Sequence, residues 1–161
     1  MKYLFYCETK IGRIGLAENG EAITNIFFRS EKAPSNTKEH STSLLRRAAR
    51  QIEEYLNGQR TEFDLPLKPE GTEFQRAVWK ALLTIPYGTT KSYRDIAEQI
   101  NSPKAYRAVG MANHQNPITI IIPCHRVIGS DGSLTGYGGG LKLKQQLLDL
   151  EKNNNKTTKK K

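Results

Sequence analysis

The sequence predicts an α+β protein of two units, and three observations support this class. Residues 1–68 contain three short apolar runs typical of β-strands, followed by one helical run. Residues 69–151 instead contain several segments with the spacing of amphipathic helices. Pro66, Pro69 and Gly71 mark the change between the two patterns. We therefore expect a small α/β unit followed by a mainly helical unit.

Length and composition favour a cytoplasmic protein without a membrane anchor. The 161 residues suffice for one or two small cores, and 37% of them are hydrophobic. No apolar stretch is long enough to span a membrane, and the first residues lack the apolar core of a signal peptide. The two cysteines, Cys7 and Cys124, predict no disulfide framework and, with three scattered histidines, no zinc site. We expect no metal and no cofactor.

The net charge of +9 suggests a polyanionic partner, most often a nucleic acid. Solubility alone would explain the same charge. Five lysines and no acids follow Glu151, and without these lysines the net charge falls to +4. Residues 152–161 are polar, so we expect them to form a basic, disordered tail.

The first unit shows the pattern of a small sheet with one helix. Three strands are expected, over residues 2–7, 11–18 and 22–28. Asn19-Gly20 is a strong hairpin turn between the second and third strands. Residues 31–43 are polar and rich in turn formers, which indicates a loop. A helix is expected from Leu44 to Leu56, ending at Gly58. This unit contains no evident chemistry, and we expect it to act as a support.

Two helices begin the second unit. Thr72 and Gln75 have the spacing of a capping box, and Pro86-Tyr87-Gly88 ends the helix that follows. Ser92 is expected to cap a second, shorter helix that breaks at Asn101.

A third helix is expected to begin at Ser102, with Pro103 in its first position. One of its faces is small and apolar, formed by Ala105, Ala108, Val109 and Ala112. Another face carries Lys104, Arg107 and Met111. Two short helices joined by a tight turn, the second with a basic outer face, predict a helix-turn-helix. A solvated helix face would show the same pattern.

The most reactive residue types lie together after a run of isoleucines. Ile120 to Ile122 predict a buried strand, and Pro123 interrupts its ladder. Cys124 and His125 then lie at a strand end or in a turn, where an imidazole can activate a thiolate. The alternative is a small buried hydrophobe beside a structural histidine.

The remaining segments suggest a wing, a ligand loop and a final helix. Residues 130–133 form a hairpin-type turn, which predicts the wing of a winged helix. The glycine-rich segment 136–140 lets backbone approach a ligand, or is a simple connector. In the last helix Glu151 lies at the edge of a leucine stripe, where it either orients a histidine or is solvated.

The second unit carries short blocks in order between residues 72 and 151. The most specific is Ile122-Pro123-Cys124-His125-Arg126-Val127-Ile128. The others are Phe74-Gln75, Val78-Trp79, Ile85-Pro86-Tyr87-Gly88, Ser92-Tyr93, Arg107-Ala108-Val109-Gly110, Asn116-Pro117 and Gly136-Tyr137 with Gly139-Gly140. Together they resemble the O6-alkylguanine-DNA alkyltransferases, which move an alkyl group from guanine O6 onto a cysteine.

The resemblance implies an α+β fold with three parts. Residues 1–68 match the family's ribonuclease-H-like N-terminal domain in size and in strand-strand-strand-helix order. Residues 69–151 would form a C-terminal winged helix-turn-helix domain that binds DNA and carries the chemistry. Residues 152–161 would follow as the basic tail. The implied protein is a monomer that binds double-stranded DNA through the minor groove.

The resemblance also implies roles for the catalytic residues. Cys124 would accept the alkyl group, and His125 would deprotonate it through a water. Glu151 would orient His125, and Asn116 would brace the turn that carries the cysteine. Tyr93 would contact the extruded guanine and help to protonate it. The substrate would be O6-alkylguanine, with O4-alkylthymine as a second candidate.

Contacts with DNA and with the flipped base are implied as well. Arg107 would enter the duplex and fill the gap left by the flipped nucleotide. The other expected DNA contacts are Lys104, Ala105, Ala108, Met111, Tyr93 and Arg126. The expected substrate pocket comprises Pro123, Val127, Tyr137 and Gly138, with no metal.

Thiol chemistry predicts a single turnover. A free thiol has a pKa of about 8.5, so it needs a base or a positive neighbour at neutral pH. The product of alkyl transfer is a thioether, which has no carbonyl for water to attack. Two alternatives remain open at this point: a winged-helix protein that binds alkylated DNA without turnover, and a small cysteine hydrolase using Cys124, His125 and Glu151.

Overall fold

The computed structural model describes residues 1–159, with side chains to Asn154, and divides the chain into two compact units. The first unit comprises Met1–Glu70 together with Pro117–Ile121. The second comprises Gly71–Asn116 and the chain from Ile122 onward. The division after Glu70 lies two residues beyond the predicted boundary. The return of Pro117–Ile121 to the first unit was not predicted.

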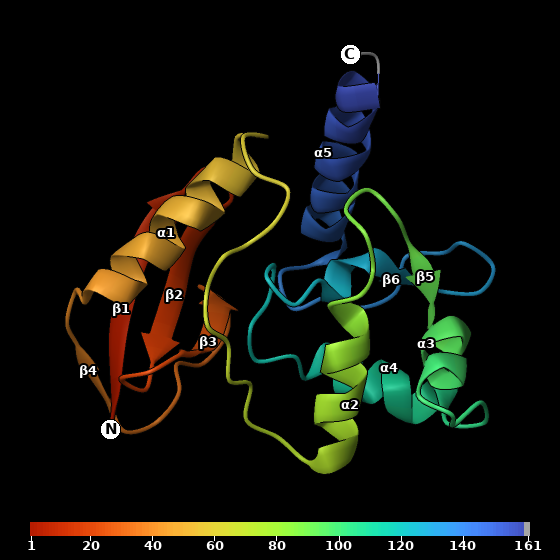
Figure 1. Ribbon diagram of the computed structural model, residues 1–161, viewed down its shortest axis with the longest axis horizontal. Coiled ribbons are helices and arrows are strands. Elements are labelled where there is room, and N and C mark those ends of the chain that lie inside the picture. The colour runs from red at the N-terminus through yellow and green to blue at the C-terminus, as the bar shows by residue number, and fades with distance from the viewer. Residues whose placement is uncertain (160–161) are drawn as a thin grey trace. The chain divides into compact units, whose positions relative to one another are not determined.

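A four-stranded sheet forms the first unit (Figure 1). Its strands are β1 (Lys2–Thr9), β2 (Gly12–Glu18), β3 (Ile23–Phe28) and β4 (Thr37–Glu39), in the order β3-β2-β1-β4. β2 pairs antiparallel with both β1 and β3, and β4 pairs parallel with β1. The three predicted strands are confirmed. β4 lies in the predicted loop because Thr-Lys-Glu has no apolar alternation to indicate a strand.

One helix, α1 (Ser43–Leu56), covers one face of this sheet (Figure 1). The Thr42 side chain caps its start by accepting from the Leu45 N–H. Gly58 adopts a φ of 75° just after its end, as predicted for a glycine stop. Beneath, the Phe27 ring lies so close to Gly15 that a Cβ there would fall 2.2 Å from Cζ. Any larger residue at position 15 would displace that ring.

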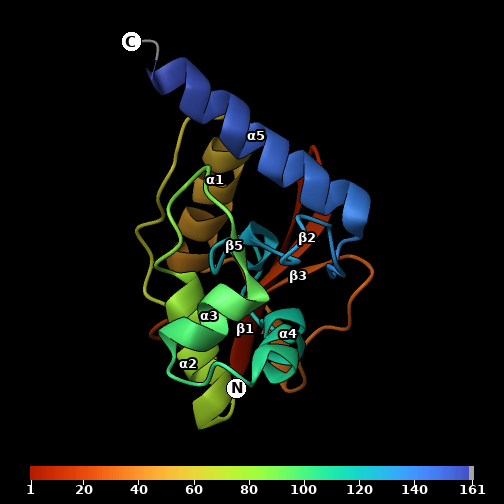
Figure 2. The same ribbon diagram turned by 90° about the vertical axis from the view of Figure 1, so that its right-hand side faces the viewer.

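Four helices and a short parallel strand pair form the second unit (Figure 2). The helices are α2 (Glu73–Leu82), α3 (Tyr93–Gln99), α4 (Tyr106–His114) and α5 (Leu141–Lys159). The strands are β5 (Lys91–Ser92) and β6 (Val127–Ile128). A single 3-10 turn, Cys124–Arg126, precedes β6.

Local capping fixes the starts of α2 and α3. The predicted capping box of Thr72 and Gln75 is present, with both reciprocal hydrogen bonds. Ser92 makes a second capping box with Asp95. The indole N–H of Trp79 donates to the Ala112 carbonyl at 2.8 Å, which ties α2 to α4.

The predicted start of the third helix, with Ser102 as the cap and Pro103 as the first helical residue, was wrong by three residues. α4 begins at Tyr106, and Ala105 precedes it without a side-chain cap. The reason is a Schellman ending of α3, in which Asn101 has a φ of 61° and the Ser102 N–H donates to the Ala97 carbonyl. Ser102 therefore closes the preceding helix instead of opening the next.

The predicted strand over Ile120–Ile122 was also wrong, although all three side chains are buried. Only Ile118 makes a strand-like bridge, parallel to Ile26 of β3. The flanking backbone bonds run from the Ile26 N–H to Pro117 O and from the Thr119 N–H to Ile26 O. The three isoleucine side chains are buried because they pack into the core, and an irregular segment can bury them as well as a strand can.

A tight turn replaces that strand. The Ile121 N–H donates to the Thr119 carbonyl at 2.8 Å, and Ile120 between them has a φ of 70°. A γ-turn with a left-handed, β-branched central residue is rare and strained. This strain lies four residues before Cys124.

Two features of the C-terminal part also differ from expectation. The turn at Gly129–Ser133 forms, but no regular strand follows it before α5, so the hairpin of a wing is incomplete in the described chain. The expected disorder from Lys152 was wrong as far as Lys159, because α5 continues through these residues. Each further residue adds a hydrogen bond to a helix already nucleated. Lys160 and Lys161 lie outside the described residues.

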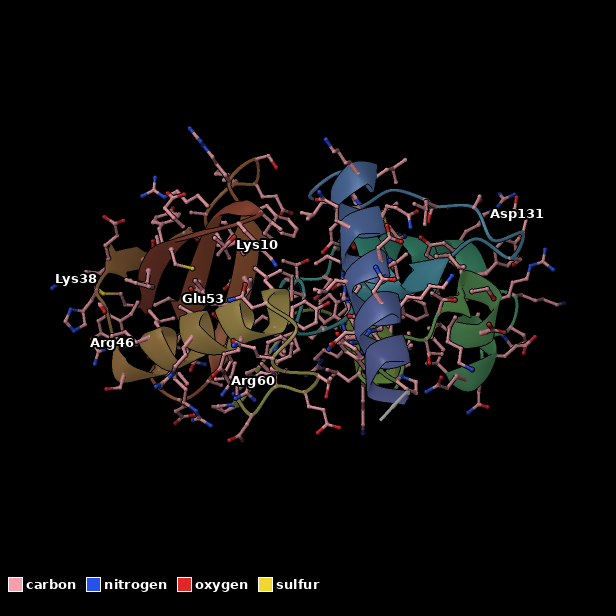
Figure 3. All side chains as sticks on the ribbon, turned by 90° about the horizontal axis from the view of Figure 1, so that it is seen from above. Lys10, Lys38, Arg46, Glu53, Arg60 and Asp131 are labelled. Atoms are coloured by element: carbon pink, nitrogen blue, oxygen red, sulfur yellow. The ribbon has the colours of Figure 1, made fainter. Side chains whose placement is uncertain are left out.

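Charged side chains cover the surface of both units. Lys10, Lys38 and Arg46 are exposed on the first unit, and Asp131 on the second (Figure 3). Among the described residues no helix is both long enough and apolar enough to cross a membrane.

Candidate active site

Cys124 lies at the end of a turn that is held by one backbone hydrogen bond and one side-chain hydrogen bond. Pro123 has φ −80° and ψ 64°, and the Cys124 N–H donates to the Ile122 carbonyl at 2.8 Å, which makes an inverse γ-turn. Asn116 Nδ2 donates to the same carbonyl at 2.8 Å. Cys124 is only 5% exposed. The expected bracing by Asn116 therefore has a direct geometric basis.

His125 and Glu151 form a buried pair, each at most 1% exposed. Nε2 of His125 lies 2.7 Å from Oε2 of Glu151. Burial lowers the pKa of His125, and the contact with Glu151 only partly opposes this shift. Burial alone would raise the pKa of Glu151, but contacts with His125 and Arg126 lower it to about 2. A carboxylate at Nε2 requires the proton on that nitrogen, so Nδ1 is the basic nitrogen of a neutral imidazole.

Arg126 completes this network, and its predicted contact with DNA was wrong. Its Nε and Nη2 donate to the two oxygens of Glu151 at 2.8 and 2.9 Å, and its Nη1 donates to the Ile85 carbonyl at 2.7 Å. The side chain is 8% exposed. A bidentate pair with a buried carboxylate leaves the guanidinium unavailable to phosphates. No local pattern around Arg126 indicates a carboxylate partner 25 residues further along the chain.

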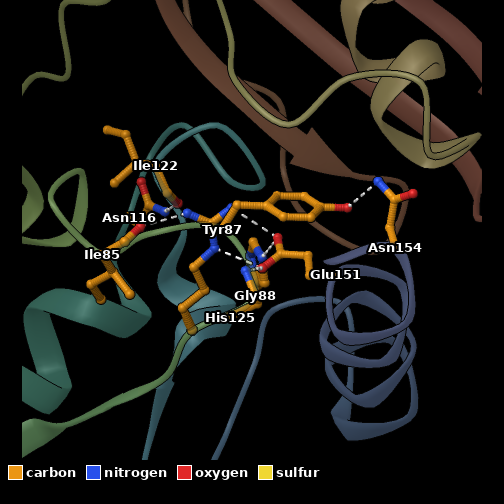
Figure 4. A network of polar contacts seen from close by, with 9 residues as sticks. Ile85, Tyr87, Gly88, Asn116, Ile122, His125, Glu151 and Asn154 are labelled. Carbon is orange, nitrogen blue, oxygen red and sulfur yellow. Dashed lines mark hydrogen bonds and ion pairs between the residues drawn. The ribbon is translucent and has the colours of Figure 1, made fainter. Parts of the chain in front are cut away.

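The network extends to the turn after α2 (Figure 4). The Gly88 N–H donates to Oε1 of Glu151 at 3.2 Å, and Arg126 lies over the Tyr87 ring at 5.6 Å. Asn154, one helical turn beyond Glu151, donates to the Tyr87 hydroxyl at 3.1 Å. The turn at residues 86–88 therefore does more than end a helix, because it encloses the Glu151 carboxylate.

Lys144 is a buried cation that the sequence analysis missed. Its side chain is fully buried, and Nζ donates to Val127 O at 2.7 Å and Thr135 O at 3.2 Å. Burial lowers the pKa of Lys144, while its interaction with Cys124 opposes that shift. The available signal was its position in α5, seven residues before Glu151 and so on the same inward face.

The expected pocket residues differ in exposure. Val127 and Tyr137 are buried, and Gly138 is exposed. The hydroxyl of Tyr93, at the start of α3, forms a hydrogen bond with the side chain of Thr135. Tyr93 therefore contacts the side chain of Thr135, the residue whose carbonyl accepts from Lys144.

Five of the expected DNA contacts lie on α4 or in the two residues just before it. Lys104, Arg107 and Ala108 are exposed, and Ala105 is half-buried. Met111 is 61% exposed, which is unusual for a large apolar side chain. Val109 and Ala112 are buried against the rest of the unit, as the apolar pattern predicted. Within the described residues no cluster of three or more His, Cys, Asp or Glu side chains could hold a metal ion.

The fold and this geometry define a class of protein: a ribonuclease-like α/β unit joined to a helical unit in which a buried cysteine lies beside a histidine paired with a carboxylate. Two family models cover almost the whole chain. Residues 1–69 match the ribonuclease-like domain of 6-O-methylguanine DNA methyltransferases, and residues 73–153 match the DNA-binding domain of the same proteins. The chain therefore belongs to the methylated-DNA–protein-cysteine methyltransferase family, and the resemblance inferred from its blocks is confirmed.

Individual relatives agree over nearly their full length. The methylated-DNA–protein-cysteine methyltransferase of Methanosarcina barkeri is 53% identical over 156 residues, covering 94% of this chain and 98% of the relative. The Mycobacterium tuberculosis protein of the same name is 52% identical over 149 residues, covering 90% and 89%. A crystal structure of Mycobacterium tuberculosis OGT in complex with DNA superposes with a TM-score of 0.90 at 47% identity, covering 94% of each chain. The predicted fold class is confirmed.

Proposed function

We propose that this protein repairs DNA by moving the alkyl group of O6-alkylguanine onto Cys124, once per molecule. The observation that carries the proposal is the buried pair of a neutral His125 and an ionised Glu151 next to Cys124. Relatives that match almost the entire chain are named for this activity.

The reaction follows from the residues present. A water between Cys124 and His125 passes the thiol proton to Nδ1, and Glu151 stabilises the imidazolium through Nε2. The thiolate attacks the alkyl carbon, a C–S bond forms and the bond to guanine O6 breaks. Tyr93 supplies the donor for the developing charge on the base. The product is a thioether at Cys124, and the chain offers no group that reverses it.

Access to O6 requires the nucleotide to leave the stack. The exposed surface formed by Lys104, just before α4, and by Arg107 and Met111 of α4 would lie in the minor groove and support this extrusion. The homologous Mycobacterium tuberculosis protein was crystallised with DNA, which supports a DNA-bound mode of action. Neither Cys7 nor Cys124 forms a disulfide in the part of the chain that the structure describes, which suits a reducing compartment, and we place the protein in the cytoplasm as a monomer.

Intact-mass analysis after incubation with DNA containing O6-methylguanine tests this proposal. The wild type should gain one methyl group, located at Cys124 by peptide mapping. Cys124→Ser should gain none while still binding DNA, and the matched control Cys7→Ser should react like the wild type. A methyl group at Cys7 would contradict the assignment. Lesion binding without any mass change would indicate a non-catalytic sensor, and ester turnover without DNA would indicate a hydrolase.

A further inference from the structure

Asn113, in the last turn of α4, is a buried amide to which the reaction above assigns no role. Its side chain is 3% exposed and lies on the inner face of the helix with Val109 and Ala112. Asparagine is uncommon in cores because its amide has two donors and an acceptor oxygen that must all be satisfied. A buried amide at this place therefore requires an explanation.

The contacts of Asn113 direct it toward the cysteine. Nδ2 donates to the Cys124 carbonyl at 3.4 Å. Oδ1 is buried and has no hydrogen-bond partner among the described residues. Since both atoms belong to one planar amide, this acceptor lies close to the backbone of the nucleophile.

Asn116 provides an internal comparison. Its Nδ2 donates to the Ile122 carbonyl at 2.8 Å, so the two asparagines hold the carbonyls on either side of Pro123. The bond from Asn116 is short and suffices to fix the turn. The bond from Asn113 is long, and its acceptor oxygen is directed at no other group of the described chain. The two amides are therefore not equivalent.

We propose that Asn113 is a positioning residue whose Oδ1 holds the water that passes the proton from Cys124 to His125. This inference rests on the proposed function. Nε2 of His125 is occupied by Glu151, so Nδ1 is the nitrogen that acts toward the thiol. A buried water typically makes about three hydrogen bonds. It accepts from the Cys124 thiol and donates to Nδ1 of His125 and to Oδ1 of Asn113.

The proton balance of this step is complete. The thiol proton passes to the water oxygen as one water proton passes to Nδ1, so the water is regenerated and the products are a thiolate and an imidazolium. The second water proton stays on the hydrogen bond to Asn113. Asn113 therefore exchanges no proton and acts only by fixing the water.

Single-turnover methyl transfer at saturating lesion DNA, measured across pH, tests the inference. Asn113→Leu keeps the volume and removes the acceptor, and should slow transfer by about tenfold or more at neutral pH. The loss should shrink at alkaline pH, where solvent ionises the thiol and the relay is not needed. The matched control is Gln115→Leu, which removes an exposed amide bonded to Gln75 and should leave the profile unchanged.

A second pair keeps the test informative if Asn113→Leu does not fold. Asn113→Ser retains a hydroxyl acceptor and Asn113→Ala does not, while the two differ little in size. The serine variant should be faster than the alanine variant at neutral pH and equal to it at alkaline pH. Equal rates at every pH, or a loss that is independent of pH, would overturn the role of Asn113. A wild type that gains no methyl group would instead contradict the proposed function.

Discussion

Each unit of this protein buries one glutamate among its described residues, and the groups that donate hydrogen bonds to the two carboxylates differ. Glu18 of the first unit is 4% exposed and accepts from the Gly20 N–H and the Thr42 hydroxyl, both at 2.6 Å. These neutral donors tie a hairpin to the start of α1. Glu151 of the second unit instead accepts from an imidazole and a guanidinium. The first carboxylate holds backbone, and the second sets protonation states.

The two units also differ in their numbers of basic and acidic residues. Residues 1–70 contain eleven basic and ten acidic residues, whereas residues 71–161 contain fourteen and six. Among its described residues the second unit also buries three basic side chains, His125, Arg126 and Lys144. Buried charges cost free energy unless they are paired, so their concentration around one cysteine indicates a site built for chemistry.

The largest expected effect comes from breaking the ion pair at Arg126. Arg126→Leu leaves the Glu151 carboxylate buried without its guanidinium, which should cost about 3–5 kcal/mol of unfolding free energy. The matched control, Arg60→Leu, removes a more exposed pair with Glu54 in the first unit and should cost roughly 0–1 kcal/mol. Denaturant titration of both variants measures the difference. Equal losses of unfolding free energy would show that the buried pair at Arg126 contributes no more to stability than the exposed pair at Arg60.

The two glutamates give the next contrast. Glu151→Gln should slow methyl transfer by about a hundredfold, because a neutral amide cannot stabilise the imidazolium. Glu18→Gln should leave the transfer rate unchanged, since Glu18 contacts only the hairpin and the start of α1. Single-turnover rates at saturating DNA are the measurement. If Glu151→Gln reacts like the wild type, Glu151 has only a structural role.

Acid stability should separate the wild type from Glu151→Gln. The pKa of Glu151 falls from 4.5 to about 2 on folding, so its contribution to stability is complete above about pH 5 and is lost as the pH falls toward 2. The wild type should therefore lose stability across that window, and Glu151→Gln should lose less. Thermal melts at pH 2 to 6 measure this, and parallel curves for the two proteins would contradict it.

A smaller effect, confined to duplex DNA, is expected for Arg107→Ala. If Arg107 fills the vacated stack, its loss should cost a few kcal/mol in duplex repair and little on single-stranded or mismatched DNA, where extrusion is easier. If it only contacts phosphate, all three substrates should suffer alike and the salt slope should fall by about one unit. Single-turnover rates on the three substrates with the same lesion distinguish the two roles.

Local signals in the sequence predicted the parts of the fold that depend on neighbours along the chain. The capping box at Thr72 and the cap at Ser92 were predicted, because each depends on residues at most three positions apart. The start of α4 was not, because Ser102 fits a cap by residue type but is used to close α3. The residue type of Ser102 favours a helix terminus, and its hydrogen-bond partner decides whether it starts the next helix or ends the preceding one.

The site shows the same limit at longer range. Cys124 and His125 stand out as adjacent reactive residues, and Glu151 stands at the edge of a leucine stripe, where the resemblance implied its role. Arg126 was assigned to DNA through the resemblance alone, and an arginine beside a nucleophile suits a carboxylate as well as a phosphate. Lys144 was missed because nothing local distinguishes a buried lysine from the solvated ones beside it. Only the fold brings these two cations into the interior.

The smallest expected effect concerns the basic end of α5, which sharpens the contrast in charge between the units. Deleting residues 155–161 removes four lysines but keeps Asn154 and its bond to Tyr87. DNA affinity should fall most at low salt, with the salt slope reduced by about one unit for each lysine that contacts phosphate. The transfer rate at saturating DNA should not change. The control Asn154→Ala loses the Tyr87 contact but keeps every lysine, so its affinity should match the wild type while its stability falls by about 0.5–1.5 kcal/mol. A slower transfer in the truncated protein at saturating DNA would show that these lysines act on the reaction itself, because binding is already complete under that condition.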